Sequence, residues 1–118
     1  MPVCDHQTVG TATFERIDRD GERTLMVTGE VDLAVKPDFE EQLTRLLAEA
    51  HSPGYVDLAE VTFMDSSGLA ALINAKKGGD AMGVGLTIVN PSEPVRQVLS
   101  ISGVDHFLHV RDRGLHLG

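Results

Sequence analysis

The side chains best suited to chemistry lie in one short segment, Phe63–Leu69, whose sequence is FMDSSGL. Asp65, Ser66 and Ser67 are residue types that commonly cap a helix N-terminus, so capping alone is one explanation of the segment. A helix N-terminus also stabilises anions, so a phosphate on Ser67 would meet N–H donors and a favourable helix dipole. The segment therefore predicts either a purely structural cap or a serine that can carry a phosphate.

A catalytic nucleophile is a further interpretation of Ser67, and the sequence disfavours it. The nucleophile elbow Gly-x-Ser-x-Gly is absent, because Asp65 stands where the first glycine belongs. His51 and His106 are the histidines considered as a base, and nothing in the sequence places either of them beside Ser67. A serine hydrolase or a small-ligand carrier stays open as an alternative.

Neither a metal site nor a nucleotide site is expected elsewhere in the chain. The residues that could suggest a metal are Cys4, His6, His106, His109 and His116. Their spacings differ from the paired short loops of structural zinc sites, so they are interpreted as solvated side chains. The glycine-rich stretch 78–85 follows a helical pattern and precedes a strand, whereas a dinucleotide-binding fingerprint follows a strand and opens a helix.

Hydrophobic periodicity predicts the strands and helices that position these residues. Strands are expected over 11–17, 23–31, 55–59, 85–89 and 107–110. Residues 1–10 are expected to be loose, and 60–65 to form a connection. Helices are expected over 37–51, from Ser67 to the pair Gly78-Gly79, and between Ser92 and Gly103. The resulting β-β-α-β-α-β-α-β order predicts an α/β fold with a mixed, mostly parallel sheet and helices packed on it.

Length and charge limit the classes of protein to which the chain can belong. Its 118 residues predict a single domain, 1–118. The formal net charge of −8 disfavours binding to nucleic acid or to an anionic membrane, because like charges repel. A single cysteine, no leader-like N-terminus and no apolar run long enough to span a bilayer indicate a cytoplasmic protein.

Four short motifs together resemble one known family. They are Gly29–Asp32 (GEVD), Val56–Leu58 (VDL), Phe63–Leu69 (FMDSSGL) and Asn90–Ser92 (NPS). With these motifs the chain closely resembles the bacterial anti-sigma factor antagonists of the STAS-domain family, over residues 10–110. The resemblance implies a single STAS-like domain, in agreement with the element order expected from periodicity.

The resemblance implies a switch and not an enzyme. In this family the unphosphorylated antagonist binds an anti-sigma factor that is a serine kinase, and so frees a sigma factor, in processes such as stress response and sporulation. The kinase phosphorylates the serine before the motif glycine, which corresponds to Ser67, and a PP2C-type phosphatase reverses the modification. The partner-binding residues implied are Asp32, Asp65, Ser66, Ser67, Gly68, Leu69 and Ala70. No cofactor, metal, nucleic acid or membrane is implied.

Two alternatives stay open within the family. Some members keep the fold without being phosphorylated, and act as regulatory or scaffold subunits of signalling or transport complexes. A weak homodimer is also compatible with the resemblance. The intact Asp65–Gly68 motif, DSSG, favours the phosphorylated class.

Overall fold

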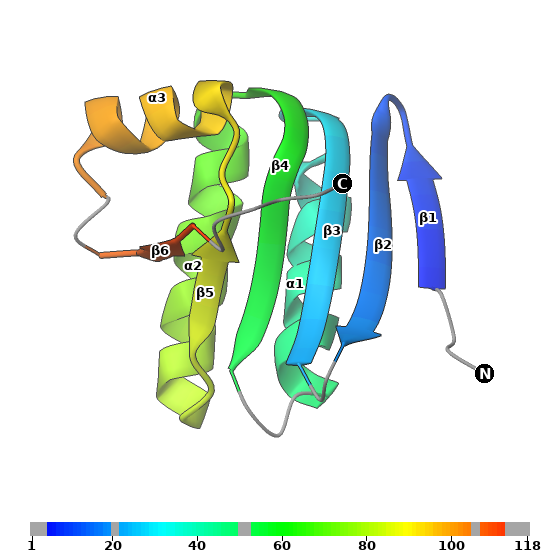
Figure 1. Ribbon diagram of the computed structural model, residues 1–118, viewed down its shortest axis with the longest axis vertical. Coiled ribbons are helices and arrows are strands. Elements are labelled where there is room, and N and C mark those ends of the chain that lie inside the picture. The colour runs from blue at the N-terminus through cyan, green and yellow to red at the C-terminus, as the bar shows by residue number, and fades with distance from the viewer. Residues whose placement is uncertain (1–4, 20–21, 50–52, 105–106, 113–118) are drawn as a thin grey trace.

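A mixed sheet and three helices make up the described part of the chain, which is residues 5–19, 22–49, 53–104 and 107–112 of a computed structural model (Figure 1). The strands are β1 (Asp5–Val9), β2 (Ala12–Arg19), β3 (Glu22–Val31), β4 (Gly54–Met64), β5 (Leu86–Val89) and β6 (His109–Arg111). The helices are α1 (Lys36–Glu49), α2 (Ser66–Met82) and α3 (Glu93–Ser102). The expected α/β fold with a mixed sheet is confirmed.

The six strands form one sheet and follow the order of the sequence, from β1 to β6. β1, β2 and β3 pair antiparallel, and β3, β4, β5 and β6 pair parallel. Each parallel step needs a crossover, which α1, α2 and α3 supply in turn. The carboxyl ends of β3 and β4 therefore lie side by side, at the edge of the sheet from which the chain enters α1 and α2 (Figure 1).

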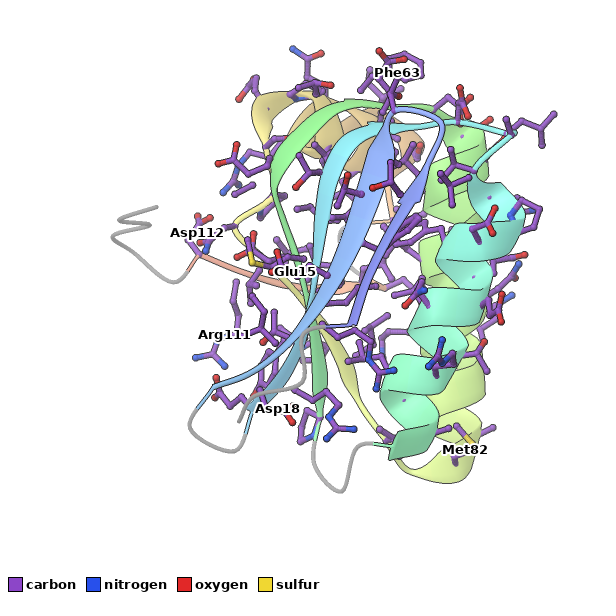
Figure 2. The ribbon with its side chains drawn as sticks, turned by 90° about the vertical axis from the view of Figure 1, so that its right-hand side faces the viewer. Glu15, Asp18, Phe63, Met82, Arg111 and Asp112 are labelled. Carbon is purple, nitrogen blue, oxygen red and sulfur yellow. The ribbon has the colours of Figure 1, made fainter. Side chains whose placement is uncertain are left out.

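One face of the sheet packs against α1 and α2, as the side view in Figure 2 shows. The buried side chains that join these layers include Leu25, Val56, Leu58 and Ile88 from the strands and Leu43, Leu46 and Leu72 from the helices. The rings of Phe14 and Phe39 stack with their centroids 5.9 Å apart and so link β2 to α1. Glu15 and Arg111 lie on the opposite face, away from both helices (Figure 2).

The expectation that residues 1–10 are loose is wrong for β1, which pairs with β2 from Asp5 to Val9. The turn between the two strands is tight, and Gly10 adopts a φ of 59° there. β1 is an edge strand whose first four residues are all polar, so it carries no apolar alternation that periodicity could reveal. The observed element order therefore begins with three strands before the first helix.

The expected connection over 60–65 is also wrong, because β4 continues to Met64. β3 runs beside it to the end, with Glu30 paired to Phe63 and Val31 paired to Met64. Two register shifts interrupt this pairing. They break the strict alternation of buried and exposed side chains that marks a strand in a sequence.

The glycine pair Gly78-Gly79 does not end α2, which continues to Met82. Gly83 is the residue that caps this helix, with a left-handed φ of 76°. Gly79 instead marks a close approach, since a Cβ at that position would lie 2.5 Å from the backbone oxygen of Val84. Gly79 therefore has a packing role inside this helix, whereas a Cβ at Gly78 would meet no heavy atom within 4 Å.

The ends of α3 agree with the sequence. Ser92 is its N-cap and Gly103 its left-handed C-cap, although the Ser92 side chain makes no cap hydrogen bond. β5 and β6 lie within two residues of their expected bounds. Within the described ranges, no helix is both long and apolar enough to cross a membrane.

Candidate functional site at the ends of β3 and β4

The carboxyl ends of β3 and β4 bring together the two aspartates predicted for the site. Val31 and Met64 are paired, and the backbone N–H of Asp65 donates to the carbonyl of Val31 at 3.3 Å. Asp32 thus follows one strand end and Asp65 follows its neighbour. This is the edge at which α/β sheets commonly place their binding sites. We call Asp32, Asp65, Ser66 and Ser67 the serine edge.

Asp32 shapes the entry of the chain into α1. Its carboxylate Oδ1 accepts a hydrogen bond from the N–H of Val35 at 3.3 Å. Its backbone carbonyl accepts from the N–H groups of Val35 and Lys36 at 3.1 and 3.0 Å. These local bonds fix the position of Asp32, and its side chain remains partly exposed beside the end of β4.

Asp65 is the N-cap of α2, which confirms the capping role that the sequence leaves open for it. The backbone is extended there, with φ −105° and ψ −171°. Its Oδ1 accepts from the N–H of Ser67 at 2.8 Å and from the N–H of Gly68 at 3.4 Å. A phosphate on Ser67 would meet N–H donors at this helix end, as expected, but two of them are already bonded to Asp65.

Ser66 and Ser67 are the first two residues of α2. Ser66 is exposed and Ser67 is partly exposed. Among the described residues, the structure gives no hydrogen-bond partner to the hydroxyl of Ser67. Within the described ranges the hydroxyl is therefore unbonded, and it belongs to a partly exposed residue whose backbone N–H is bonded to Asp65.

Gly68 holds the first turn of α2 close to the sheet. A Cβ at this position would lie 2.8 Å from Met64 Cγ and 2.9 Å from Val31 Cγ1, closer than real Cβ contacts come. Leu69 is 5% exposed and belongs to the core, and Ala70 is partly exposed. Gly68 and Leu69 therefore position the serines, while their contact with a partner stays a prediction.

Two exposed apolar residues next to the serine edge are missing from the sequence-based set. Phe63 is 46% exposed and comes two residues before Asp65, and Figure 2 shows it at the end of the molecule. Leu33 is 69% exposed and directly follows Asp32. The sequence signal for Leu33 is weak, because a single leucine outside any periodic pattern does not reveal whether it is buried.

The described residues give no support to a serine hydrolase, a small-ligand carrier or a metal site. His51 and His106, considered as bases for Ser67, lie outside these residues, as do Cys4 and His116. Within the described part of the chain, no three residues of metal-binding type are grouped as a site. A cleft of about 280 Å³ lies between α1 and α2, and Glu40, Asn74 and Gly78 are among its lining residues, whereas Ser67 is not.

Comparisons with known proteins agree with the fold. The STAS domain family matches residues 13–113. An anti-sigma-B factor antagonist of Staphylococcus epidermidis is 31% identical over 99 residues, which cover 84% of this chain and 92% of that relative. The crystal structure of an anti-sigma factor antagonist from Mycobacterium paratuberculosis superposes with a TM-score of 0.72 at 23% identity, covering 85% of each chain. The Bacillus cell fate determinant SpoIIAA in its phosphorylated form gives a TM-score of 0.59 at 17% identity, covering 92% of this chain and 90% of that one.

The two solved structures support the fold alone, because their identity to this chain is low. The family match spans most of the chain, and it includes both strand ends and the whole of α2. The Staphylococcus relative adds an alignment across nearly its full length. On this evidence the chain belongs to the STAS-domain family.

Proposed function

We propose that the chain is an anti-sigma factor antagonist, that its unphosphorylated form binds an anti-sigma factor serine kinase, and that phosphorylation of Ser67 weakens this binding. The observation that carries the proposal is that Ser67 is partly exposed on the first turn of α2, next to the close-packed Gly68, and that its hydroxyl has no hydrogen-bond partner among the described residues. The similarity to the anti-sigma-B factor antagonist of Staphylococcus epidermidis supports the antagonist function. Binding of the kinase frees a sigma factor, and a PP2C-type phosphatase resets the switch in the cytoplasm.

The charge of the serine edge supplies a physical reason for the switch. A phosphate on Ser67 adds about −1.5 to −2 charges at pH 7. The Asp65 carboxylate already accepts from the N–H groups of Ser67 and Gly68, so the phosphate lies next to a carboxylate and does not replace it. Asp32 follows the paired strand end. The modification therefore concentrates negative charge on a surface that must lose water when a partner binds.

Two free energies decide how the phosphate affects binding: the stabilisation of its charge by the helix dipole and the cost of burying that charge at the interface. The dipole of α2 offsets about 0.3–1 kcal/mol of the added charge, and salt screens this contribution. An uncompensated charge buried at an interface costs about 2–5 kcal/mol. The cost exceeds the offset and leaves about 1–4.7 kcal/mol, so phosphorylation is expected to weaken kinase binding by roughly fivefold to a few thousandfold. The fold is expected to persist, because the phosphate sits on a partly exposed side chain.

Site-specific phosphorylation tests the proposal. The chain is incubated with ATP and, one at a time, with each purified serine-kinase anti-sigma factor of the source bacterium, and tandem mass spectrometry locates the phosphate. Ser66→Ala is the matched control for Ser67→Ala, since both remove one hydroxyl from the same turn. The expected result is phosphorylation of the wild type and of Ser66→Ala, and none of Ser67→Ala.

Two outcomes would contradict the proposal. A phosphate found on Ser66 would show that Ser67 is not the residue that the kinase modifies. A kinase that binds the chain tightly and leaves Ser67 unmodified in the presence of ATP would instead indicate a STAS-fold regulatory subunit that is not phosphorylated.

A further inference from the structure

The exposed large apolar side chains are unevenly placed on the described surface. They are Leu33, Phe63, Met82, Ile101 and Phe107. Two of them, Leu33 and Phe63, lie within two positions of an aspartate of the serine edge. A single exposed apolar residue needs no explanation, but two that border one candidate site can form the apolar centre of an interface.

The pairing of β3 and β4 places Leu33 and Phe63 on the two strand ends that form the site. Phe63 is paired with Glu30 and immediately precedes Met64, whose partner is Val31. Leu33 comes two residues after Val31. Their neighbours Val31 and Met64 are 0% and 3% exposed and fill the core, whereas Phe63 and Leu33 keep 46% and 69% of their surface in solvent. The core therefore does not account for the apolar character of these two positions.

Several charged residues lie on the same strands and loops as the two apolar side chains, and most of those residues are acidic. Glu30 is exposed and lies beside Phe63 in the sheet, and Glu60 is exposed on β4. Asp32 and Asp65 are partly exposed at the two strand ends, and Lys36 at the start of α1 is a basic residue close to Asp32 in the chain. A partner that covers this surface must present positive charge around an apolar centre, because desolvated like charges repel.

We infer that Leu33 and Phe63 are the apolar anchors through which this chain binds its anti-sigma factor. The kinase would bind them in an apolar pocket that is surrounded by lysine and arginine side chains. This inference rests on the proposed function. A phenylalanine can bury a larger apolar area at an interface than a leucine, so Phe63 is the stronger anchor. The acidic rim, Glu30 and Glu60, accelerates association and makes it sensitive to salt.

Truncation of each anchor tests the inference, with Met82→Ala as the matched control. Met82 is 58% exposed and lies at the other end of α2, about 24 Å from Ser66 by the helix rise. Figure 2 shows Phe63 and Met82 at opposite ends of the molecule. Each variant is titrated calorimetrically into the serine-kinase anti-sigma factor that binds the wild type. The affinity of Phe63→Ala is expected to be lower than that of the wild type by a factor of roughly 30 or more. Leu33→Ala is expected to lose about five- to 30-fold, and Met82→Ala less than about twofold.

A second pair of variants tests the rim. Glu30→Gln and Glu22→Gln change the net charge equally, and Glu22 lies at the other end of β3, about 27 Å away along the strand. Glu30→Gln is expected to lower the association rate constant several-fold at low salt, with a smaller effect at high salt. Glu22→Gln is expected to leave this rate constant nearly unchanged.

The outcomes separate the inference from the function on which it rests. If the wild type binds a kinase in a Ser67-dependent manner while Phe63→Ala and Leu33→Ala bind equally well, the anchors are wrong and the proposed function stands. If the wild type binds none of the serine-kinase anti-sigma factors, both the function and the anchors are overturned. Circular dichroism and thermal unfolding of each variant check the fold, which truncation of exposed side chains is expected to preserve.

Discussion

Two adjacent glycines in α2 predict opposite effects of the same substitution. A Cβ on Gly78 would meet no heavy atom within 4 Å, whereas a Cβ on Gly79 would lie 2.5 Å from the backbone oxygen of Val84 and 3.1 Å from Leu47 Cδ1. The chain turns away from the helix after Gly83, and a hydrogen bond from the N–H of Val84 to the carbonyl of Gly79, at 2.8 Å, holds Val84 against Gly79. The obstacle at Gly79 is therefore backbone held in place by the C-cap.

The magnitudes follow from the helical conformation that both residues share. Replacing glycine by alanine inside a helix stabilises it by about 0.5–1 kcal/mol, so Gly78→Ala is expected to raise the free energy of unfolding by this amount. Gly79→Ala gains the same propensity but adds an overpacking cost of about 1–3 kcal/mol, which makes the variant destabilised overall. Because the propensity gain cancels, the difference between the two variants measures the overpacking cost.

Urea unfolding of wild type and both variants checks this prediction. The chain has no tryptophan and one tyrosine, so far-ultraviolet circular dichroism is the suitable signal. A change in the midpoint at constant slope reports a change in stability alone. Gly78→Ala is expected to shift the midpoint upward and Gly79→Ala downward. Equal destabilisation by both would refute the reasoning, because it would mean that α2 ends at the glycine pair.

Three further predictions concern the core and the serine edge. Leu72→Ala removes a fully buried side chain from α2 and is expected to cost about 2–5 kcal/mol of unfolding free energy, so an unchanged urea midpoint would contradict the packing. Asp65→Ala is expected to cost about 0.5–2 kcal/mol through the lost cap, whereas Asp65→Asn keeps a capping oxygen and is expected to lose much less, as differential scanning calorimetry would reveal. Ser67→Asp is expected to weaken kinase binding less than the phosphate does, while Ser67→Ala keeps binding and cannot be switched off. Equal calorimetric affinities of the phosphorylated and alanine forms would exclude the charge mechanism.

Elements with one buried face could be predicted from the sequence. Phe39, Leu43, Leu46 and Leu47 repeat at helical spacing, and all four are buried in α1 as that spacing predicts. β1 could not be predicted, because it is held by backbone pairing to β2 and its sequence starts with four polar residues. Where side-chain burial does not define an element, periodicity carries no signal for it.

The candidate site was predictable in its residue types but not in its bonding. Three adjacent capping residues, Asp65, Ser66 and Ser67, indicate a helix start, and the structure selects Asp65 as the cap. The consequence for the Ser67 phosphate, that two N–H donors are occupied, depends on a 2.8 Å and a 3.4 Å bond that no sequence pattern specifies. The exposure of Leu33 likewise depends on how the loop after β3 leaves the sheet.

The contact of Gly68 with Val31 and Met64 means that Ser67 belongs to a helix turn anchored to two strands before any kinase arrives. A kinase that modifies Ser67 must therefore accept a folded surface and not an extended peptide. The bond between Asp65 and the N–H groups of Ser67 and Gly68 would have to break for the segment to become extended. A short peptide with the sequence of residues 60–73 lacks the strands that hold this turn, so it should be a poor substrate compared with the folded domain. Recognition of the serine would then double as a check that the antagonist is folded.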